Sequence, residues 1–256
     1  MKRLHPRVLL VVLIALTTVL PVSVAVASSL DEIKAKGVLR FGTDATYPPF
    51  ESVDKDGKIV GFDIDVGNEV ARRMGLKAEF INTAWDGIFM ALNAKHFDVI
   101  ISSVSITEKR QEAYDFSTPY KDSSQIVVVR KDNRDIRSKA DLRGKKVGVQ
   151  IGTTSEKEAK KVGGVGEVKS YSTFTEPFME LSFERIDAVI VNSAVANVFI
   201  GRYPEKFKTT GEPFLHKEQG IVIRKGEREL KEAIDKVIKQ MIEDGWLPKL
   251  RQKYMI

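Results

Sequence analysis

A group of small polar residues and one arginine, residues 102–110 (SSVSITEKR), directly follows the apolar run FDVII. The run predicts a buried parallel strand, so the polar group leaves the sheet at a strand's carboxyl end. Thr107 is a suitable helix N-cap, which would put Arg110 in the first helical turn. Amide groups at a helix start favour an anion, and a guanidinium holds a carboxylate through two parallel hydrogen bonds. The stretch predicts a binding site for a small carboxylate; the alternative is a surface ion pair between Arg110 and Glu108 or Glu112.

A second predicted helix start carries similar chemistry. The strand KVGVQ ends at Gln150 and is followed by GTTSE, in which Gly152 permits close backbone approach and Thr153 and Thr154 add hydroxyl groups. In an open parallel sheet, ligands gather beyond the carboxyl ends of the strands. We therefore expect the two helix starts to grip one carboxylate from opposite sides of a cleft.

Other residues fall at predicted strand ends and complete the candidate site. Tyr47 and Trp85 suit aromatic walls, although core packing is the alternative for each, and Asp44 or Asp63 suits a positive ligand group. Asp63 is equally suited to capping the helix that follows it. The predicted ligand-binding residues are Asp44, Tyr47, Asp63, Trp85, Ser102, Ser103, Ser105, Arg110, Gln150, Thr153, Thr154 and Asn192.

The order of the predicted elements indicates an α/β fold with two lobes. Strands and helices alternate in each half, and NAKHFDVIISSVS in the first half has the same pattern as SFERIDAVIVNSAV in the second. The chain would cross between the lobes near residues 121 and 218, making a two-strand hinge. An amphipathic helix over residues 227–244 would dock back on the first lobe. We expect lobe 1 at residues 28–121 and 219–256, and lobe 2 at residues 122–218, each with an open, mostly parallel sheet and flanking helices.

The first 27 residues are typical of a cleaved signal peptide. Lys2, Arg3 and Arg7 precede an apolar run, and Ala-Val-Ala ends at residue 27. The alternative is a membrane anchor, but the run is shorter than the roughly 20 residues that a spanning helix needs. Removing the three cations lowers the formal net charge from +6 to +3, so the charge does not indicate a nucleic-acid partner. The chain has no cysteine, hence no disulfide framework and no lipid-attachment site. We expect a periplasmic protein.

Five motifs, in this order and spacing, resemble the periplasmic amino-acid-binding proteins of ABC importers, solute-binding protein family 3. The family includes the lysine/arginine/ornithine- and histidine-binding proteins. The motifs are GTDATYPPFE, GFDIDV, ISSVSITEKR, VGVQIGTTSE and IDAVIVNSAVA. The resemblance covers nearly the whole chain after the signal and implies the type II binding-protein fold, which closes on one amino acid.

The resemblance also implies roles for particular residues. Arg110, Ser105 and Thr154 would hold the α-carboxylate, while Ser103 and Ser105 would help hold the α-ammonium. The residues around the ligand side chain would be Asp44, Tyr47, Asp63, Trp85 and Ser102. The chain departs from the family at Asn192, where an aspartate usually pairs with the α-ammonium. This departure predicts either weaker amino-acid binding or a ligand with a different group there.

We expect a binding protein and not an enzyme, with no cofactor or metal, that delivers an amino acid to a membrane ABC permease and is a monomer. Asp44 beside aromatic residues favours a basic ligand such as arginine or lysine. The alternative is an enzyme similar to cyclohexadienyl dehydratase, which shares this fold and would need a well-placed acid such as Asp44 or Asp63. A third, less favoured hypothesis is that the chain is the sensor domain of a receptor.

Overall fold

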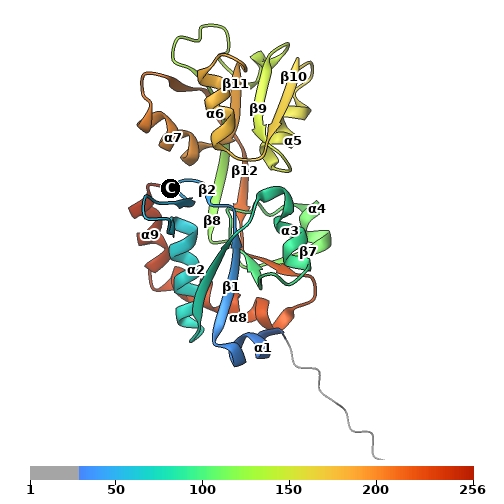
Figure 1. The fold of residues 1–256 in the computed structure, drawn as a ribbon, viewed down its shortest axis with the longest axis vertical. Helices are drawn as coiled ribbons and strands as arrows, with labels where there is room; N and C mark the ends of the chain where they lie inside the picture. The colour runs from blue at the N-terminus through green and yellow to red at the C-terminus, as the bar shows by residue number, and fades with distance from the viewer. Residues whose placement is uncertain (1–28) are drawn as a thin grey trace, which may run out of the picture.

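The computed structural model describes residues 29–256, and the predicted signal peptide lies outside this range. Two lobes are stacked along the long axis of the molecule, and each contains a five-stranded sheet flanked by helices (Figure 1). The predicted two-lobed α/β fold is therefore confirmed.

The lobe that contains the start of the described chain is built on the sheet β5-β1-β6-β13-β7. Strands β5, β1 and β6 are parallel, whereas β13 is antiparallel to both β6 and β7. A small antiparallel sheet, β2-β3-β4, includes a hairpin in which residues 54–58 connect β3 to β4. The strands are β1 (Val38–Thr43), β2 (Thr46–Tyr47), β3 (Glu51–Val53), β4 (Ile59–Val60), β5 (Lys77–Asn82), β6 (Val99–Ile100), β7 (Tyr114–Phe116) and β13 (Val222–Arg224). The helices are α1 (Ser29–Lys36), α2 (Phe62–Arg73), α3 (Trp85–Asn93), α4 (Glu108–Ala113), α8 (Arg228–Glu243) and α9 (Trp246–Tyr254).

The other lobe is built on the sheet β10-β9-β11-β8-β12. Its first three strands are parallel, and β8 and β12 are antiparallel to their neighbours. The strands are β8 (Lys121–Arg130), β9 (Lys146–Gln150), β10 (Glu167–Tyr171), β11 (Ala188–Asn192) and β12 (Phe207–Gln219). The helices are η1 (Lys139–Leu142), α5 (Thr154–Lys161), α6 (Thr175–Ser182) and α7 (Ser193–Arg202).

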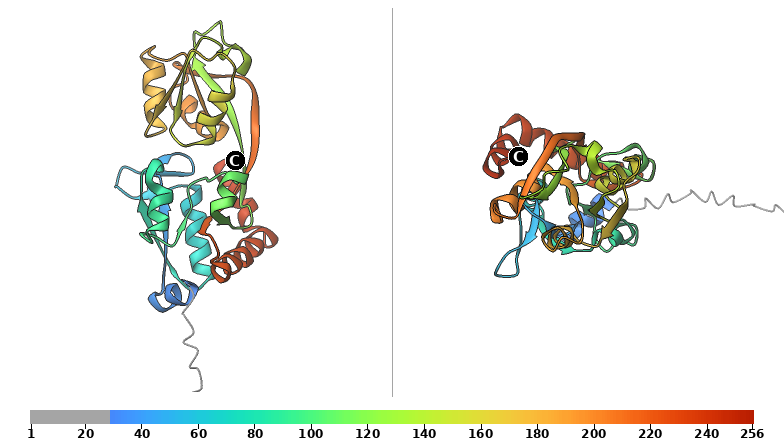
Figure 2. Two further views of the ribbon diagram at one scale, coloured as in Figure 1. Left: turned by 90° about the vertical axis from the view of Figure 1, so that its right-hand side faces the viewer. Right: turned by 90° about the horizontal axis from the view of Figure 1, so that it is seen from above.

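Strands β8 and β12 also connect the two lobes. They run side by side from one lobe into the other in both side views (Figures 1 and 2). Their pairing extends from Phe207↔Arg130 at one end to Gln219↔Lys121 at the other. The predicted hinge of two paired strands is present.

The C-terminal helices complete the first lobe, as the amphipathic pattern predicted. Helix α8 contacts α1 and α2 and buries the predicted apolar face: Leu230, Ile234, Val237, Ile238 and Met241. Each such side chain contributes roughly 1.5–3 kcal/mol when it is fully buried. This packing explains why a segment from the end of the chain belongs to the lobe that contains its start.

One local expectation was imprecise. In the strand expected over residues 97–101, only Val99–Ile100 is paired with neighbouring strands. Helix α3 begins at Trp85 with Ala84 at its N-cap, so Asp86 lies in the first turn. There its charge faces the helix dipole favourably without capping a backbone amide.

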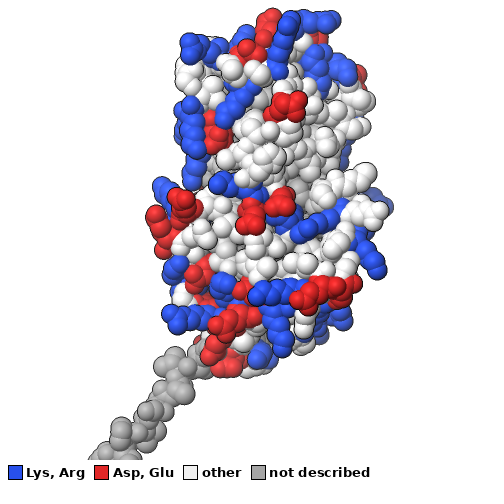
Figure 3. Space-filling model, turned by 180° about the vertical axis from the view of Figure 1, so that it is seen from behind, with Lys and Arg blue, Asp and Glu red and all other residues white. Residues whose placement is uncertain are grey.

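The surface of the described chain carries charges of both signs. Figure 3 shows Lys and Arg interspersed with Asp and Glu over both lobes on the face opposite to that in Figure 1. Within residues 29–256, no helix combines the length and the apolar character that crossing a bilayer requires.

Candidate functional site

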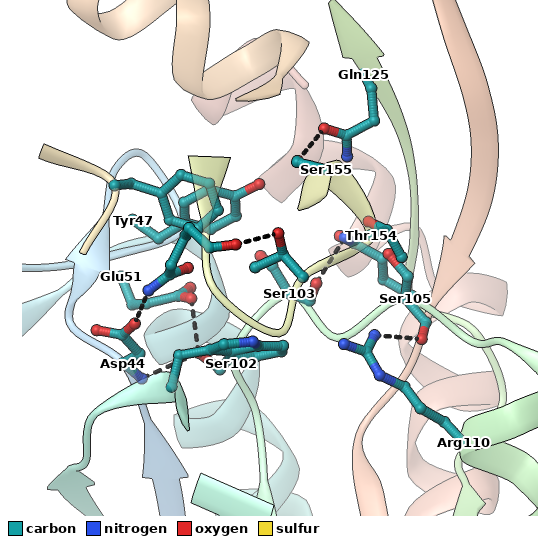
Figure 4. Close-up of a pocket in the computed structure, with 15 residues that line it drawn as sticks. Asp44, Tyr47, Glu51, Ser102, Ser103, Ser105, Arg110, Gln125, Thr154 and Ser155 are labelled. Atoms are coloured by element: carbon teal, nitrogen blue, oxygen red, sulfur yellow. Dashed lines mark hydrogen bonds between the residues drawn. The ribbon is translucent and has the colours of Figure 1, made fainter. Parts of the chain in front are cut away.

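A small cavity lies between the lobes, at the carboxyl ends of β1, β6 and β9 (Figure 4). Ten of the twelve predicted site residues line it, and both lobes contribute. The lining residues are Asp44, Tyr47, Glu51, Trp85, Ser102, Ser103, Ser105, Arg110, Gln125, Gln150, Thr153, Thr154, Ser155, Phe174 and Gln219. The position of the cavity follows from the parallel strands, whose polar residues leave each sheet at the edge that faces the other lobe.

Arg110 lies in the first turn of α4, where the sequence predicted it. Thr107 caps this helix, because its side chain accepts a hydrogen bond from the backbone N–H of Arg110. The guanidinium donates to the carbonyl oxygen of Ser105 at 2.9 Å and lies 5.3 Å from the centre of the Trp85 ring. Burial lowers the pKa of Arg110 to about 10, so the group still carries its charge at neutral pH. The remaining guanidinium donors are available to an anion in the cavity.

The second helix start faces the same cavity from the other lobe. Thr153 is the N-cap of α5 and accepts from the N–H of Glu156, while its own hydroxyl donates to the carbonyl of Gln150 at 2.7 Å. Gly152 has φ of 72°, and a Cβ added there would lie 3.4 Å from Nε1 of Trp85. A methyl group at this position would therefore be in van der Waals contact with Trp85, which shows how close the backbone of one lobe lies to an aromatic side chain of the other.

The end of the cavity away from Arg110 is acidic. Asp44 accepts hydrogen bonds from Gln150 at 2.7 Å and from Thr46 at 2.9 Å, and its backbone N–H donates to Ser102. Burial raises the pKa of Asp44, and the hydrogen bond from Gln150 opposes this shift. The bond between Asp44 and Gln150 also links the two lobes.

Glu51 is a second carboxyl group at this end and was not among the predicted site residues. It is fully buried, and Oε1 accepts from the Ser102 hydroxyl at 2.9 Å, while Oε2 has no partner among residues 29–256. Burial, reinforced by Asp63, raises the pKa of Glu51 well above its usual value. In the sequence, Glu51 is one of several acidic residues around the hairpin, and no local pattern distinguishes it from Asp54 or Asp56.

Aromatic rings from both lobes close one side of the cavity. Tyr47 of the first lobe packs against Phe174 of the second, with ring centroids 4.1 Å apart and an interplanar angle of 31°. Offset aromatic pairs of this kind contribute roughly 0.5–1.5 kcal/mol beyond the area they bury. Together with the Asp44–Gln150 bond and the Gly152–Trp85 contact, the pair shows that the lobes are closed against each other.

Ser103 forms the floor of the cavity in a constrained conformation. Its φ of 48° lies in the left-handed region, which is uncommon for residues other than glycine. Its backbone N–H and hydroxyl donate to Asp63 Oδ2, and its hydroxyl accepts from Lys121 Nζ at 2.9 Å. Gln219 donates to its carbonyl oxygen at 2.6 Å. Residues of α2, β8 and β12 therefore hold this serine in place.

The remaining two predicted residues, Asp63 and Asn192, do not line the cavity. Asp63 is fully buried behind Ser103, where it also accepts a hydrogen bond from the Tyr120 hydroxyl at 2.8 Å. Asn192 is the N-cap of α7, and its Oδ1 accepts from the N–H of Ala194 at 2.8 Å. Asp63 thus supports the site from beneath, and the side chain of Asn192 is engaged in capping.

Four further lining residues were missed by the sequence analysis: Gln125, Ser155, Phe174 and Gln219. Ser155 follows the predicted GTT motif directly, and its hydroxyl donates to Gln125 Oε1 at 2.6 Å. The motif could therefore have identified Ser155. The other three residues come from elsewhere: Gln125 from β8, Gln219 from β12 and Phe174 from the loop before α6.

The polar and charged groups that line the cavity are suited to binding a small ligand. One end offers a guanidinium with two helix starts, the other offers two carboxyl groups, and amides and hydroxyls lie between them. Within residues 29–256, no cluster of three or more His, Cys, Asp or Glu is arranged to hold a metal ion.

Comparison with known proteins agrees with this architecture. Residues 39–256 match the family described as bacterial extracellular solute-binding proteins, family 3. The L-cystine-binding protein TcyJ of Escherichia coli is 37% identical over 227 residues, which cover 88% of this chain and 85% of that protein. The histidine-binding periplasmic protein of Salmonella typhimurium is 37% identical over 228 residues, which cover 84% of this chain and 86% of that protein.

Solved structures are similar over most of their length. A mutant of ArgBP from T. maritima superposes with a TM-score of 0.84 at 40% identity, covering 88% of this chain and 98% of that one. An ancestral arginine-binding protein bound to arginine gives a TM-score of 0.82 at 45% identity, covering 85% and 98%. An ancestral amino-acid-binding protein, AncCDT-1, described as a precursor of cyclohexadienyl dehydratase, gives 0.83 at 40% identity, covering 89% and 99%.

Proposed function

Because this chain belongs to the bacterial extracellular solute-binding proteins of family 3, we propose that it binds an amino acid between its lobes and delivers it to a membrane ABC importer. The single observation that carries this proposal is the shared cavity of Arg110 and the Thr153–Thr154 helix start. An α-carboxylate between them would receive hydrogen bonds from both lobes and so favour the closed form. Charge-assisted hydrogen bonds of this kind contribute roughly 1.5–3 kcal/mol each.

The remaining roles follow the predicted assignments. Ser105 would assist Arg110 and Thr154 at the carboxylate, and Ser103 would accept a hydrogen bond from the α-ammonium. Since the side chain of Asn192 is engaged in capping α7, the ammonium would depend on the serines for its acceptors. Asp63 would contribute by orienting Ser103 and not by touching the ligand.

We favour a basic amino acid, arginine or lysine, as the ligand. Asp44 and Glu51 lie at the end of the cavity away from Arg110, where the side chain of a ligand gripped by its carboxylate would point. Tyr47 and Trp85 supply aromatic faces, which attract cations. The arginine-binding proteins among the structural neighbours support the same choice.

Thermal-shift screening of ligand-stripped protein against the common amino acids tests the proposal. A ligand present at 100 times its Kd stabilises the folded state by about 2.7 kcal/mol, which raises the melting temperature measurably. We expect arginine or lysine to give the largest shift. Arg110→Met should abolish the shift, whereas Lys109→Met, which removes an exposed cation one residue away, should preserve it. No shift with any amino acid would contradict the proposal.

The domain boundaries and the location follow from the same proposal. Residues 28–121 and 219–256 would form one rigid lobe and residues 122–218 the other, with bending where β8 and β12 leave the first lobe. Residues 1–27 would direct the chain to the periplasm and be removed there. The mature protein would act as a monomer.

One observation favours a second candidate function, a dehydratase of the cyclohexadienyl type. Glu51 is a cavity carboxyl group with a raised pKa, which is the property that a general acid needs to protonate a leaving group. The precursor relationship stated for AncCDT-1 adds support. Incubation with prephenate or arogenate, followed by detection of the aromatic product, tests this alternative; the absence of product would exclude it.

A further inference from the structure

Three carboxyl groups and two cations are buried around the cavity. Asp44, Glu51 and Asp63 lie at or beneath its acidic end with Lys121, and Arg110 lies across from them; each is at most 9% exposed. If all five were ionised, the group would carry one net negative charge. A net charge out of contact with water is unfavourable, so the site favours either one added proton or one added cation.

Among these carboxyl groups, Glu51 is the best placed to bind the added proton or the added cation. Both oxygens of Asp44 accept hydrogen bonds from side chains, and Asp63 does not line the cavity. Glu51 lines the cavity, is fully buried, and its Oε2 has no partner in the described part of the chain. An oxygen in that position can bind a proton or accept a hydrogen bond from a ligand.

The charged and titratable groups around Glu51 come from several elements. Asp44 after β1 and Asp63 on α2 raise its pKa, and Lys121 on β8 lowers it. The phenols of Tyr47 and Tyr120 are buried nearby, and burial raises their pKa values well above the usual one, so they stay neutral. Arg251 on α9 acts on Lys121, whose pKa is lowered to about 8 chiefly by burial. Below that pH Lys121 is charged and the phenols are neutral, and both oxygens of Asp44 are already hydrogen-bonded, so Glu51 is the carboxyl group whose charge a ligand can change.

We propose that Glu51 is a specificity-determining residue that exchanges its proton for the cationic end of a ligand side chain. This rests on the amino-acid-binding function proposed above. The protonated carboxyl group releases one proton to solvent, and the resulting carboxylate pairs with the ligand cation. A neutral ligand of the same shape leaves the proton in place. Binding of a cationic amino acid is thus coupled to pH, and binding of a neutral one is not.

The sign of the coupling follows from linkage. While Glu51 is protonated in the free protein and ionised in the complex, the affinity for a cation rises about tenfold for each pH unit. This slope holds below the pKa of Glu51 in the free protein and flattens above it. Arginine keeps its own charge throughout this range. The affinity for citrulline, the neutral isostere of arginine, has no such slope.

Isothermal titration calorimetry at about pH 6, where Lys121 is charged, tests the proposal in two buffers of different ionisation enthalpy. We expect arginine to release up to one proton per molecule bound and citrulline to release none. Glu51→Gln should abolish the proton release and remove the pH dependence of the preference for arginine. Asp56→Asn, an exposed change in the same hairpin, should retain both.

Each outcome decides the matter. Arginine binding without proton release, or with release that persists in Glu51→Gln, overturns this inference and leaves the proposed function standing. Binding of neutral or acidic amino acids, but of neither arginine nor lysine, also overturns it. No binding by any amino acid overturns both proposals. If Glu51→Gln does not fold, the slope of arginine affinity between about pH 5 and pH 7.5 in the unaltered protein decides instead, because a flat profile contradicts the exchange.

Discussion

Gln150 at the end of β9 donates a 2.7 Å hydrogen bond to Asp44 at the end of β1, joining the two lobes through side chains that also line the cavity. The Gln150 side-chain amide is held on its other hydrogen by the carbonyl of Ser172 at 2.9 Å. The contact therefore belongs to the closed form and depends on the same residues that face the ligand.

Gln150→Ala should weaken closure more than it weakens folding. Asp44 would lose a buried partner, and leaving such a group unsatisfied costs about 1–3 kcal/mol in the closed state. We expect ligand affinity to fall by roughly 5- to 150-fold, with a small change in the melting temperature of the free protein. Calorimetric titration of both proteins measures the loss. Gln240→Ala, an exposed change on α8, is the control, and equal affinity in the Gln150 and Gln240 variants would contradict this role.

Gly152→Ala should impair folding and leave closure intact. The residue has φ of 72°, and the added Cβ would lie 3.4 Å from Trp85 of the other lobe, which is an ordinary van der Waals distance. The left-handed conformation alone costs an alanine about 1–2 kcal/mol. Gly144→Ala shares a φ of 73° but meets nothing within 4 Å, so it isolates the conformational cost. Denaturant unfolding should show similar destabilisation in both variants, and calorimetric titration should show that both keep their affinity for the ligand; a loss of affinity confined to Gly152→Ala would contradict this expectation.

Thr107→Ala should destabilise the short helix that presents Arg110. The hydroxyl accepts from the N–H of Arg110, and the loss of such a cap costs about 0.5–2 kcal/mol. We expect a lower free energy of unfolding together with weaker ligand binding, because the guanidinium is positioned by this turn. Thr107→Ser retains the cap and should restore both quantities. Failure of the serine variant to restore them would show that the methyl group, and not the cap, matters.

Because of Lys121, the free energy of unfolding should rise as the pH increases from about 8 to 10.5. Its pKa is lowered from 10.5 to about 8 in the folded protein, so the unfolded chain binds more protons between these values. The unfavourable contribution is full below about pH 8 and is relieved as the pH rises toward 10.5, by about 3 kcal/mol in all. The difference in unfolding free energy between the protein and Lys121→Met, measured from pH 7 to 10, should change by an amount approaching this value. Ionisation of the buried tyrosines lowers the unfolding free energy as the pH rises. Because this happens in both proteins, the tyrosine contribution cancels in the difference between them.

The local features of the fold could be predicted because they depend on neighbours in the chain. The capping of α4 by Thr107 and of α5 by Thr153 follows from a hydroxyl placed just before a helical turn. The buried face of α8 follows from the spacing of its apolar residues. The strand ends that carry Asp44, Ser102 and Gln150 were identified from apolar runs followed by polar residues. Each of these patterns involves residues that are only a few positions apart, so it can be recognised in the sequence itself.

What lines the cavity was decided by contacts that are distant along the chain. Glu51 and Gln219 reach the site because the β2–β3–β4 sheet and the end of β12 pack against the serines after β6. Asp63 was predicted to line the site and instead lies behind Ser103, because that serine folds over it in a left-handed conformation. The sequence by itself determined which polar residues emerge at the strand ends. The tertiary structure alone decided which of them face the cavity, since that depends on how the two sheets, one in each lobe, close on each other.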